Sequence, residues 1–384
     1  MPLSEQLDRL AGLEPAPYPV VSLYLNLQPG QHGRDQHQGF VRKEFKARSR
    51  TYPANSPERE SLDRDLEKIS QFLENELAPA ANGLAVFACS AGELFEVIET
   101  SAPIEQHWLY ISDRPHLYPL ARLESQYPRY AAVVADTNSA RIVVFATGDI
   151  VTEEEVKGVK TRSSSEGGWS QARFQRHISH YHMHHAKEVV DALDRIVREE
   201  GIEQILVSGD EVITPLLREH MPKHLADKIV DHFRLDMRAT VEELVKVTRD
   251  AMASLNERTD RETVEAAIGN FRAGGLGVVG PEGTLAALIK GQVDELLISA
   301  SLTQLLPVGP GGGKAAEARV ALEEPAVETV SAGAEGQDAA PEVVRLADEL
   351  ITRAKQTSAK VTFIEDASLL EEHGGVAGIL RFTI

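Results

Sequence analysis

The middle of the chain alternates short apolar runs with one long helical pattern, and this alternation constrains the fold most strongly. Residues 130–136 and 140–145 are two β-prone runs around a polar turn, and residues 205–209 form a third. Between them, residues 170–200 carry an apolar stripe at helical spacing. That stripe consists of Ala186, Val189, Val190, Leu193, Ile196 and Val197. Strands that alternate with helices predict an α/β layered domain.

The segment that enters the long helix is polar and rich in glycine. Three serines and a glutamate precede Gly167 and Gly168, and Ser170 stands where an N-cap is expected. Two adjacent glycines permit backbone conformations that other residues avoid. We therefore expect residues of about 150–168 to form an extended, exposed arm whose tip is the Gly-Gly pair.

The chain is acidic, with a formal net charge of -19 at pH 7, which argues against indiscriminate binding to naked nucleic acid. Two local groups of basic residues stand out against this background. One surrounds the Gly-Gly tip and includes Arg162, Arg173 and Arg176. The other lies on the helix expected at about 37–50 and contains Arg42, Lys43, Lys46 and Arg48. Each group suits either a solvated protein surface or a contact with RNA phosphates.

Five histidines lie between positions 177 and 185, and His180 and His184 are four residues apart, as two metal ligands on one helix face would be. No third ligand of fixed spacing accompanies them. A polar helix face, or imidazoles that face RNA, accounts better for the cluster. The single cysteine, Cys89, excludes an intramolecular disulfide and a cysteine-based metal site.

Residues 309–315 imitate a phosphate-binding loop, but Val308 stands where its first glycine is required. Ala315 replaces the serine or threonine that would hold magnesium. We therefore expect no bound nucleotide, no metal and no other cofactor.

Composition divides the 384 residues into three expected domains, an α+β domain at 1–125, a middle domain at 126–257 and an α/β domain at 258–384. Residues of about 307–341 are rich in Pro, Gly, Ala and Glu, which predicts a disordered insertion. The start of the sequence has no signal-peptide pattern, and no run of about 20 apolar residues could span a membrane. These features predict a cytoplasmic protein without membrane contact.

The ordered segments, taken together, resemble the archaeal and eukaryotic class I peptide release factors and their relative Pelota, in a bacterial form. The resemblance extends over nearly the whole chain. It rests on residues 82–87, 108–113, 136–140, 167–174, 284–288 with 291–298, and 374–381. It implies three α/β domains: an α+β first domain, a ribonuclease-H-like middle domain and a Pelota-like last domain with the insertion.

The same resemblance assigns roles to the Gly-Gly tip, because Gly167-Gly168-Trp169-Ser170-Gln171 is similar to the family's release loop. Trp169 stands where the family has its catalytic glutamine, and Gln171 follows two residues later. In a ribosomal A-site factor of this kind, the glycines would reach the peptidyl-tRNA ester and Gln171 would orient the water. The arginines would contact rRNA phosphates, and Trp169 would stack on a base.

Two departures keep other functions open. The tip at 48–57 lacks the family's stop-codon pattern, which favours rescue of stalled ribosomes, as in the Vms-type peptidyl-tRNA hydrolases, over termination. Trp169 at the glutamine position favours a silent occupant of the A site, similar to the hibernation factor Balon. A third possibility is an RNA-binding protein that acts away from the ribosome. The expected partners are the ribosome and a translational GTPase such as elongation factor Tu.

Overall fold

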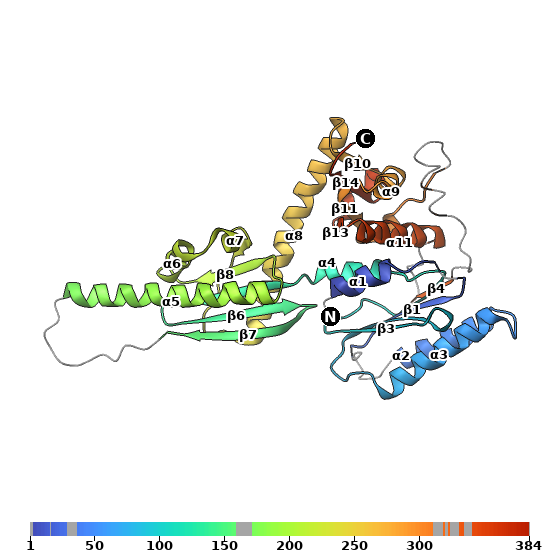
Figure 1. Ribbon diagram of the computed structural model, residues 1–384, viewed down its shortest axis with the longest axis horizontal. Helices are drawn as coiled ribbons and strands as arrows, with labels where there is room; N and C mark the ends of the chain where they lie inside the picture. Colours follow the sequence, from blue (N-terminus) through green and yellow to red (C-terminus); the bar gives the residue numbers. More distant parts are fainter. Residues whose placement is uncertain are drawn as a thin grey trace. The chain divides into compact units, whose positions relative to one another are not determined.

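The computed structural model describes residues 3–15, 17–28, 37–158, 171–309, 318, 322, 330–333 and 340–383, with the side chains of 171–177 and 330–333 left out. The described chain folds into two compact units (Figure 1). Residues 1–126 and 259–384 make up unit 1, and residues 127–258 make up unit 2. The predicted α/β class is confirmed, because two mixed sheets and one antiparallel sheet are combined with helices.

Unit 2 is built on a five-stranded sheet with the order β7-β6-β5-β8-β9. Strand β5 pairs in parallel with β8, and β8 with β9, whereas β6 is antiparallel to both of its neighbours. The sheet is therefore mixed, with parallel pairs on one side of β5 and antiparallel pairs on the other. The strands are β5 (Tyr130–Ala135), β6 (Ser139–Ala146), β7 (Asp149–Lys157), β8 (Ile205–Gly209) and β9 (Ile229–His232).

Alternation along these strands sends side chains to two separate cores. On one face, Val133 and Ile142 pack under helix α5 (Gln171–Glu199), with α6 (Ile213–His220) and α7 (Lys223–Ala226) beside it. On the other face, Val134 and Phe145 pack against α8 (Val241–Arg272) through Leu244 and Met252. Both faces of the sheet are therefore buried by helices.

Two elements next to this sheet differ from those predicted from the sequence. Residues 149–157 form β7, an edge strand, where an exposed arm was expected from residue 150. Their charged, alternating side chains suit the solvent-facing edge of a sheet, which hydropathy alone does not reveal. Residues 241–272 form the single helix α8, whereas the sequence patterns predict two helices, at about 239–256 and about 259–273. The polar residues at 257–260 contain neither glycine nor proline, so nothing there ends the helix.

Unit 1 contains two sheets. The first has the order β12-β4-β1-β2-β3, and the second has the order β10-β14-β11-β13. The first sheet and its helices comprise α1 (Leu3–Ala11), β1 (Val20–Asn26), α2 (His37–Ser49), α3 (Pro57–Asn75), β2 (Gly83–Cys89), β3 (Leu94–Thr100), β4 (Trp108–Ser112), α4 (Tyr118–Gln126) and β12 (Val330–Gly333). The second comprises β10 (Gly277–Val279), α9 (Pro281–Ile289), β11 (Val293–Ser299), α11 (Pro341–Gln356), β13 (Lys360–Ile364) and β14 (Val376–Leu380).

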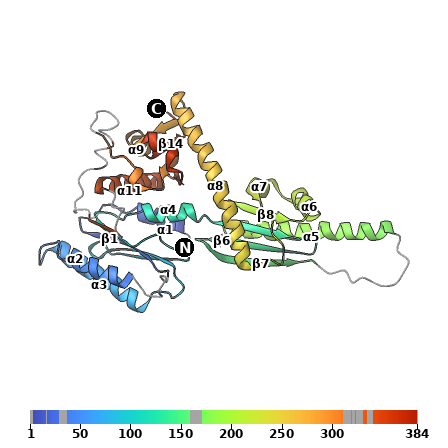
Figure 2. The same cartoon turned by 180° about the vertical axis from the view of Figure 1, so that it is seen from behind.

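The first and last segments of the chain share one core in unit 1. Helices α2 and α3 cover one face of the first sheet, where Phe45 and Leu62 are buried. The other face joins a continuous core with α1, α4, α9 and α11, in which Leu7, Tyr24 and Leu350 are almost fully buried. Figure 2 shows α1, α4 and α11 stacked between the two sheets. The division into three domains stays a prediction.

A buried polar network fastens α11 to the start of α4. The Asp348 carboxylate accepts hydrogen bonds from the backbone N–H groups of Leu117 (2.9 Å) and Tyr118 (3.1 Å). Its second oxygen lies 2.6 Å from Nδ1 of His116, whose side chain is 2% exposed. Asp348 therefore caps a helix that lies more than two hundred residues away in the sequence.

The prediction of a disordered insertion is wrong for residues 330–333, which form β12 antiparallel to β4. Gly333 lies opposite Trp108, and Val330 lies opposite Ile111. A prediction of disorder from composition considers only how much apolar side-chain surface can be buried. An edge strand, in contrast, is held mainly by backbone hydrogen bonds. Within the described residues, no helix is long and apolar enough to cross a membrane.

Candidate functional site

The predicted release loop lies at the start of α5. Helix α5 begins at Gln171, next to the expected start at residue 170. The backbone places Gln171, Arg173 and Arg176 in its first two turns, and their side chains are not described. Arg162, Gly167, Gly168 and Trp169 lie outside the described residues. The described structure next to these positions consists of the end of β7 and the helix α5.

The chain leaves β7 through a tightly held glycine. The N–H of Gly158 donates to the carbonyl of Asn138 over 2.8 Å. Asn138 belongs to the β5–β6 turn, in which the Asp136 carboxylate accepts from the N–H groups of Asn138 (2.7 Å) and Ser139 (2.8 Å). The departure point of the segment is thus fixed to a turn that is itself closed by hydrogen bonds.

Tyr181 of α5 packs against the same glycine. A Cβ atom at position 158 would lie 2.5 Å from the Tyr181 hydroxyl and 3.0 Å from the Asn138 carbonyl oxygen, so only glycine fits. Burial raises the pKa of the Tyr181 phenol, and the nearby Glu188 carboxylate raises it further. A neutral tyrosine well inside α5 therefore packs the end of β7 against the helix at Gly158.

The first half of α5 differs from its second half in burial. From His185 onward, the helix buries an apolar stripe that includes Ala186 and Val189 on the sheet. Before His185, the described side chains are exposed or half-buried, His180 and His184 being exposed. The ribbon shows this half extending past the ends of the strands (Figures 1 and 2). The described residues 178–184 therefore contribute no buried side chain to the core of their unit.

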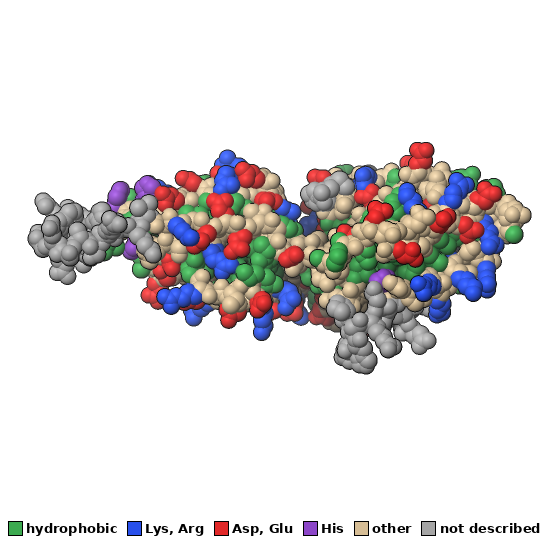
Figure 3. Space-filling view, turned by 90° about the horizontal axis from the view of Figure 1, so that it is seen from below, with side chains coloured by type: hydrophobic (Ala, Val, Ile, Leu, Met, Phe, Trp, Pro, Cys, Tyr) green, Lys and Arg blue, Asp and Glu red, His purple; other side chains and the backbone are tan. Residues whose placement is uncertain are grey.

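The histidines gather on this protruding half, where Figure 3 shows their side chains at the end of unit 2. Nδ1 of His184 lies 3.2 Å from the Glu188 carboxylate one turn later. His185 is buried, with 1% of its surface exposed. Among the residues that the structure describes, no group of three or more His, Cys, Asp or Glu side chains could hold a metal ion.

The second predicted basic group lies on α2, in unit 1. Arg42, Lys43 and Lys46 are exposed, and Figure 3 shows Lys and Arg side chains over α2 and α3. Arg48 is turned inward instead, because its guanidinium donates to the Glu44 carboxylate over 3.2 Å. The Glu44 side chain is 8% exposed and also lies 3.4 Å from Nζ of Lys43.

The spacing of the basic residues along α2 shows which of their side chains can contact an anion together. Arg42 and Lys46 lie four residues apart on α2, and both are exposed; the exposed Arg50 follows the end of the helix at Ser49. Residues four apart lie on one face of a helix. This row, rather than Arg48, is the part of the predicted group that suits a phosphate backbone.

Sequence reasoning missed Gly158 and Tyr181, which hold the base of the candidate loop. Gly158 follows the charged residues of β7, which the sequence places in the exposed arm. A glycine within such an arm gives no sign of a close contact. Tyr181 stands among the histidines, and its position in the sequence carries no signal of a contact with residue 158. Only the contact between the two residues marks them as the base of the loop.

Residues 115–255 match a family described as "Bacterial archaeo-eukaryotic release factor family 10". The matched stretch contains the Gly-Gly segment, Gly158 and all of α5. The resemblance to archaeal and eukaryotic release factors is therefore confirmed over this stretch.

Two curated relatives and one solved structure are similar over more of the chain. "Uncharacterized protein YocB" of Bacillus subtilis is 25% identical over 235 residues, 56% of this chain and 87% of that protein. "Peptide chain release factor subunit 1" of Methanobrevibacter smithii is 23% identical over 352 residues, 85% of each chain. The structure described as Dom34 of S. cerevisiae, a translation termination-like factor, shares 10% identity over 79% of each chain, with a TM-score of 0.41.

Proposed function

Starting from the release-factor family that residues 115–255 match, we propose that this chain is a cytoplasmic, ribosome-associated factor that enters the A site. There it hydrolyses peptidyl-tRNA and frees stalled ribosomes. The observation that supports the proposal is the difference in burial between the two halves of α5. Its second half is anchored in the core of unit 2, whereas none of the side chains described at 178–184 is buried. A glycine pair that precedes such a helix can be presented beyond the domain.

The chemistry needs no metal. Hydrolysis of an ester requires a positioned water and stabilisation of the negative charge that develops on the carbonyl oxygen. In the proposal, the Gly167–Gly168 backbone approaches the ester, and the Gln171 amide orients the water by hydrogen bonds. Arg162, Arg173 and Arg176 contact rRNA phosphates through charge-assisted hydrogen bonds. Trp169 stacks on an rRNA base.

The anchored base serves this mechanism by limiting the conformations of the loop. The contact of Gly158 with Tyr181 fixes the point where the chain leaves β7 against α5, so the segment that carries the tip starts from an ordered position. The exposed row on α2, Arg42 and Lys46, supplies a second phosphate contact, and the exposed Lys43 beside it adds a further cation. A translational GTPase such as elongation factor Tu is the proposed delivery partner.

The proposal is tested by peptide release from purified stalled ribosomes. The protein is expected to free the nascent chain, and Gln171→Ala to slow release about 100-fold, which is typical for the loss of one catalytic hydrogen-bonding group. Gln204→Ala is the matched control, because Gln204 precedes β8, away from α5, and should leave the rate unchanged. Equal rates for Gln171→Ala and wild type would remove the catalytic role.

The second proposed function is that of a factor that binds the A site without catalysing peptide release. Trp169, at the position of the family's glutamine, favours it. A hibernation factor would bind vacant ribosomes tightly and release no peptide. Sedimentation with 50S or 70S particles in the absence of release selects this function. A protein that binds RNA without sedimenting with either particle acts away from the ribosome.

A further inference from the structure

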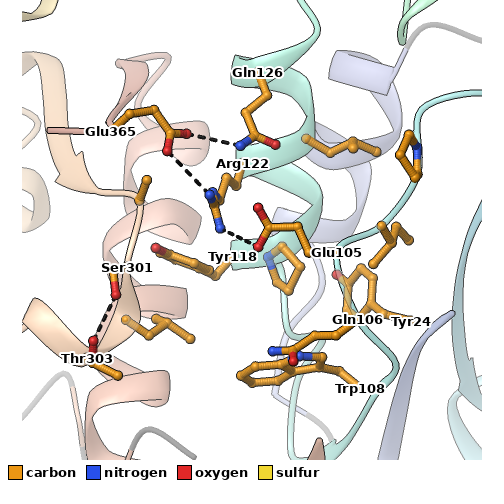
Figure 4. Close-up of a pocket in the computed structure, with 16 residues that line it drawn as sticks. Tyr24, Glu105, Gln106, Trp108, Tyr118, Arg122, Gln126, Ser301, Thr303 and Glu365 are labelled. Atoms are coloured by element: carbon orange, nitrogen blue, oxygen red, sulfur yellow. Dashed lines mark hydrogen bonds and ion pairs between the residues drawn. The ribbon is translucent and has the colours of Figure 1, made fainter. Parts of the chain in front are cut away.

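Unit 1 contains a cavity of about 270 Å³ that the proposed function does not use. The loop before β4 and helix α4 form one side of it, and the segment after β11 forms the other (Figure 4). Its volume lies near the lower limit for ligand pockets, about 300 Å³, so it suits a group the size of an amino-acid side chain.

The floor of the cavity is apolar. Tyr24 and Tyr118 are both almost fully buried, and their hydroxyls are already used. The Tyr24 hydroxyl donates to the His116 carbonyl over 2.5 Å, and the Tyr118 hydroxyl donates to the Ser299 carbonyl over 2.7 Å. Their rings therefore offer the cavity carbon surface, to which Leu302 adds more. Such a floor binds the apolar stem of a ligand.

The rim of the cavity is acidic and rich in acceptors. Arg122 lies between two carboxylates and donates to Glu105 over 2.9 Å and to Glu365 over 3.4 Å. Glu365 also accepts from the Gln126 amide over 3.0 Å. The two glutamate side chains are 62% and 49% exposed, so oxygen surface remains available to a ligand. Two carboxylates and one guanidinium give the rim a formal charge of −1.

We propose that this cavity binds an organic cation, an ammonium or guanidinium group carried on an apolar stem. The stem would lie on the tyrosine rings, and the cationic head would donate to Glu105 and Glu365. An anionic ligand is excluded by charge, because the terminal nitrogens of Arg122 already donate to these carboxylates. The head and stem match the side chains of arginine and lysine, whether in a small free amine or in a basic protein segment. The net charge of -19 favours the approach of either.

Binding can be followed by tryptophan fluorescence. The chain contains two tryptophans, so in Trp169→Phe the cavity residue Trp108 is the only reporter. N-acetyl-arginine amide is expected to change its emission with saturation. N-acetyl-citrulline amide, which has the same shape and no charge, should bind at least about tenfold more weakly, as expected for loss of a charge-assisted contact. Equal affinities for the two amides would overturn the proposal.

Three further variants test the rim. Glu365→Gln and Glu105→Gln should each weaken binding of the arginine amide about fivefold, because both carboxylates are partly exposed to solvent. Glu372→Gln is the matched control, an exposed glutamate that does not line the cavity, and should bind as wild type does. Arg122→Met should strengthen binding, since it removes the competing cation. Weaker binding by Arg122→Met, or equal losses in Glu365→Gln and Glu372→Gln, would contradict the assigned rim.

The source of the cation is resolved by a second ligand. An arginine-containing peptide that binds more than tenfold tighter than the amide identifies a protein segment as the natural ligand, whereas equal affinity identifies a small amine. All of these measurements use the protein without ribosomes. Failure of the cavity to bind a cation therefore leaves the proposed release activity standing, and the reverse also holds.

Discussion

The two units use their helices in opposite ways. In unit 1, the helices between the two sheets are buried in a common core, and Asp348 ties residues at 116–118 to α11. In unit 2, α5 is buried only from His185 onward, and its first half protrudes from the sheet. The first arrangement stabilises a scaffold, and the second presents a polar segment to a partner. The comparison predicts that mutations in unit 1 change stability, whereas those at the start of α5 change function.

The largest expected effect lies in the scaffold. Asp348→Ala leaves the N–H groups of Leu117 and Tyr118 and the ring of His116 without their acceptor. Unpaired buried donors should lower the free energy of unfolding by about 3 kcal/mol. The midpoint of urea denaturation measures the loss. Asp348→Asn, which keeps the shape and one oxygen, should lose less, and an equal loss in both variants would assign the effect to charge alone.

A smaller loss is expected at the base of the loop. Gly158→Ala places a methyl group 2.5 Å from the Tyr181 hydroxyl and should destabilise unit 2 by about 2 kcal/mol. Adding Tyr181→Phe removes the clashing oxygen and should recover part of that loss. Thermal unfolding of the single and double variants measures both steps. Additive losses would show that the two residues do not touch in solution.

The exposed row on α2 should affect binding and not folding. Lys46→Ala is expected to weaken ribosome binding about threefold and to reduce its salt dependence by the equivalent of one phosphate contact. Its unfolding midpoint should match that of wild type, because Lys46 is exposed. Filter binding at several salt concentrations measures the first effect. Arg48→Ala is the contrasting variant, since Arg48 pairs with Glu44 and its loss should change stability.

The smallest effect is a dependence on pH in unit 2. Hydrogen bonds from Thr152 and Arg129 lower the pKa of the Glu200 carboxyl below its usual value of 4.5. A lowered pKa in the folded state contributes stability above pH 4.5, and this is lost as the pH falls through the folded-state value. Glu200→Gln should therefore cost about 0.5 kcal/mol at pH 7 and less at acidic pH. Urea titrations at pH 7 and pH 3.5 measure the difference, and an unchanged gap would contradict the assignment.

Local patterns predicted much of unit 2. The stripe from Ala186 to Val197 predicted α5, and the apolar runs predicted β5, β6 and β8. The same reasoning failed where an element is decided by its neighbour. Strand β7 is charged and is held at the edge by β6, and β12 is held by β4. The helices predicted at about 239–256 and about 259–273 form one helix, because no helix-ending residue separates them.

The candidate site was predicted in part. The start of α5 and the basic residues of α2 could be placed from helical spacing. The inward turn of Arg48 toward Glu44 depends on the burial of Glu44, and the contact of Tyr181 with Gly158 depends on how α5 crosses the end of β7. The cavity beside Arg122 could not be anticipated, because its walls come from distant parts of the chain, from Tyr24 to Glu365.

By itself, the sequence determined the α/β class, the main strands of unit 2, the position of α5 and the resemblance to release factors. These properties follow from the spacing of apolar residues within a few turns or strand repeats, and from short motifs. Only the tertiary structure decided that the two ends of the chain share one core, that Asp348 caps α4, and that Gly158 and Tyr181 close the base of the loop. Such contacts join residues that are distant along the chain, and no local pattern specifies which distant surface will bury or neutralise a given side chain.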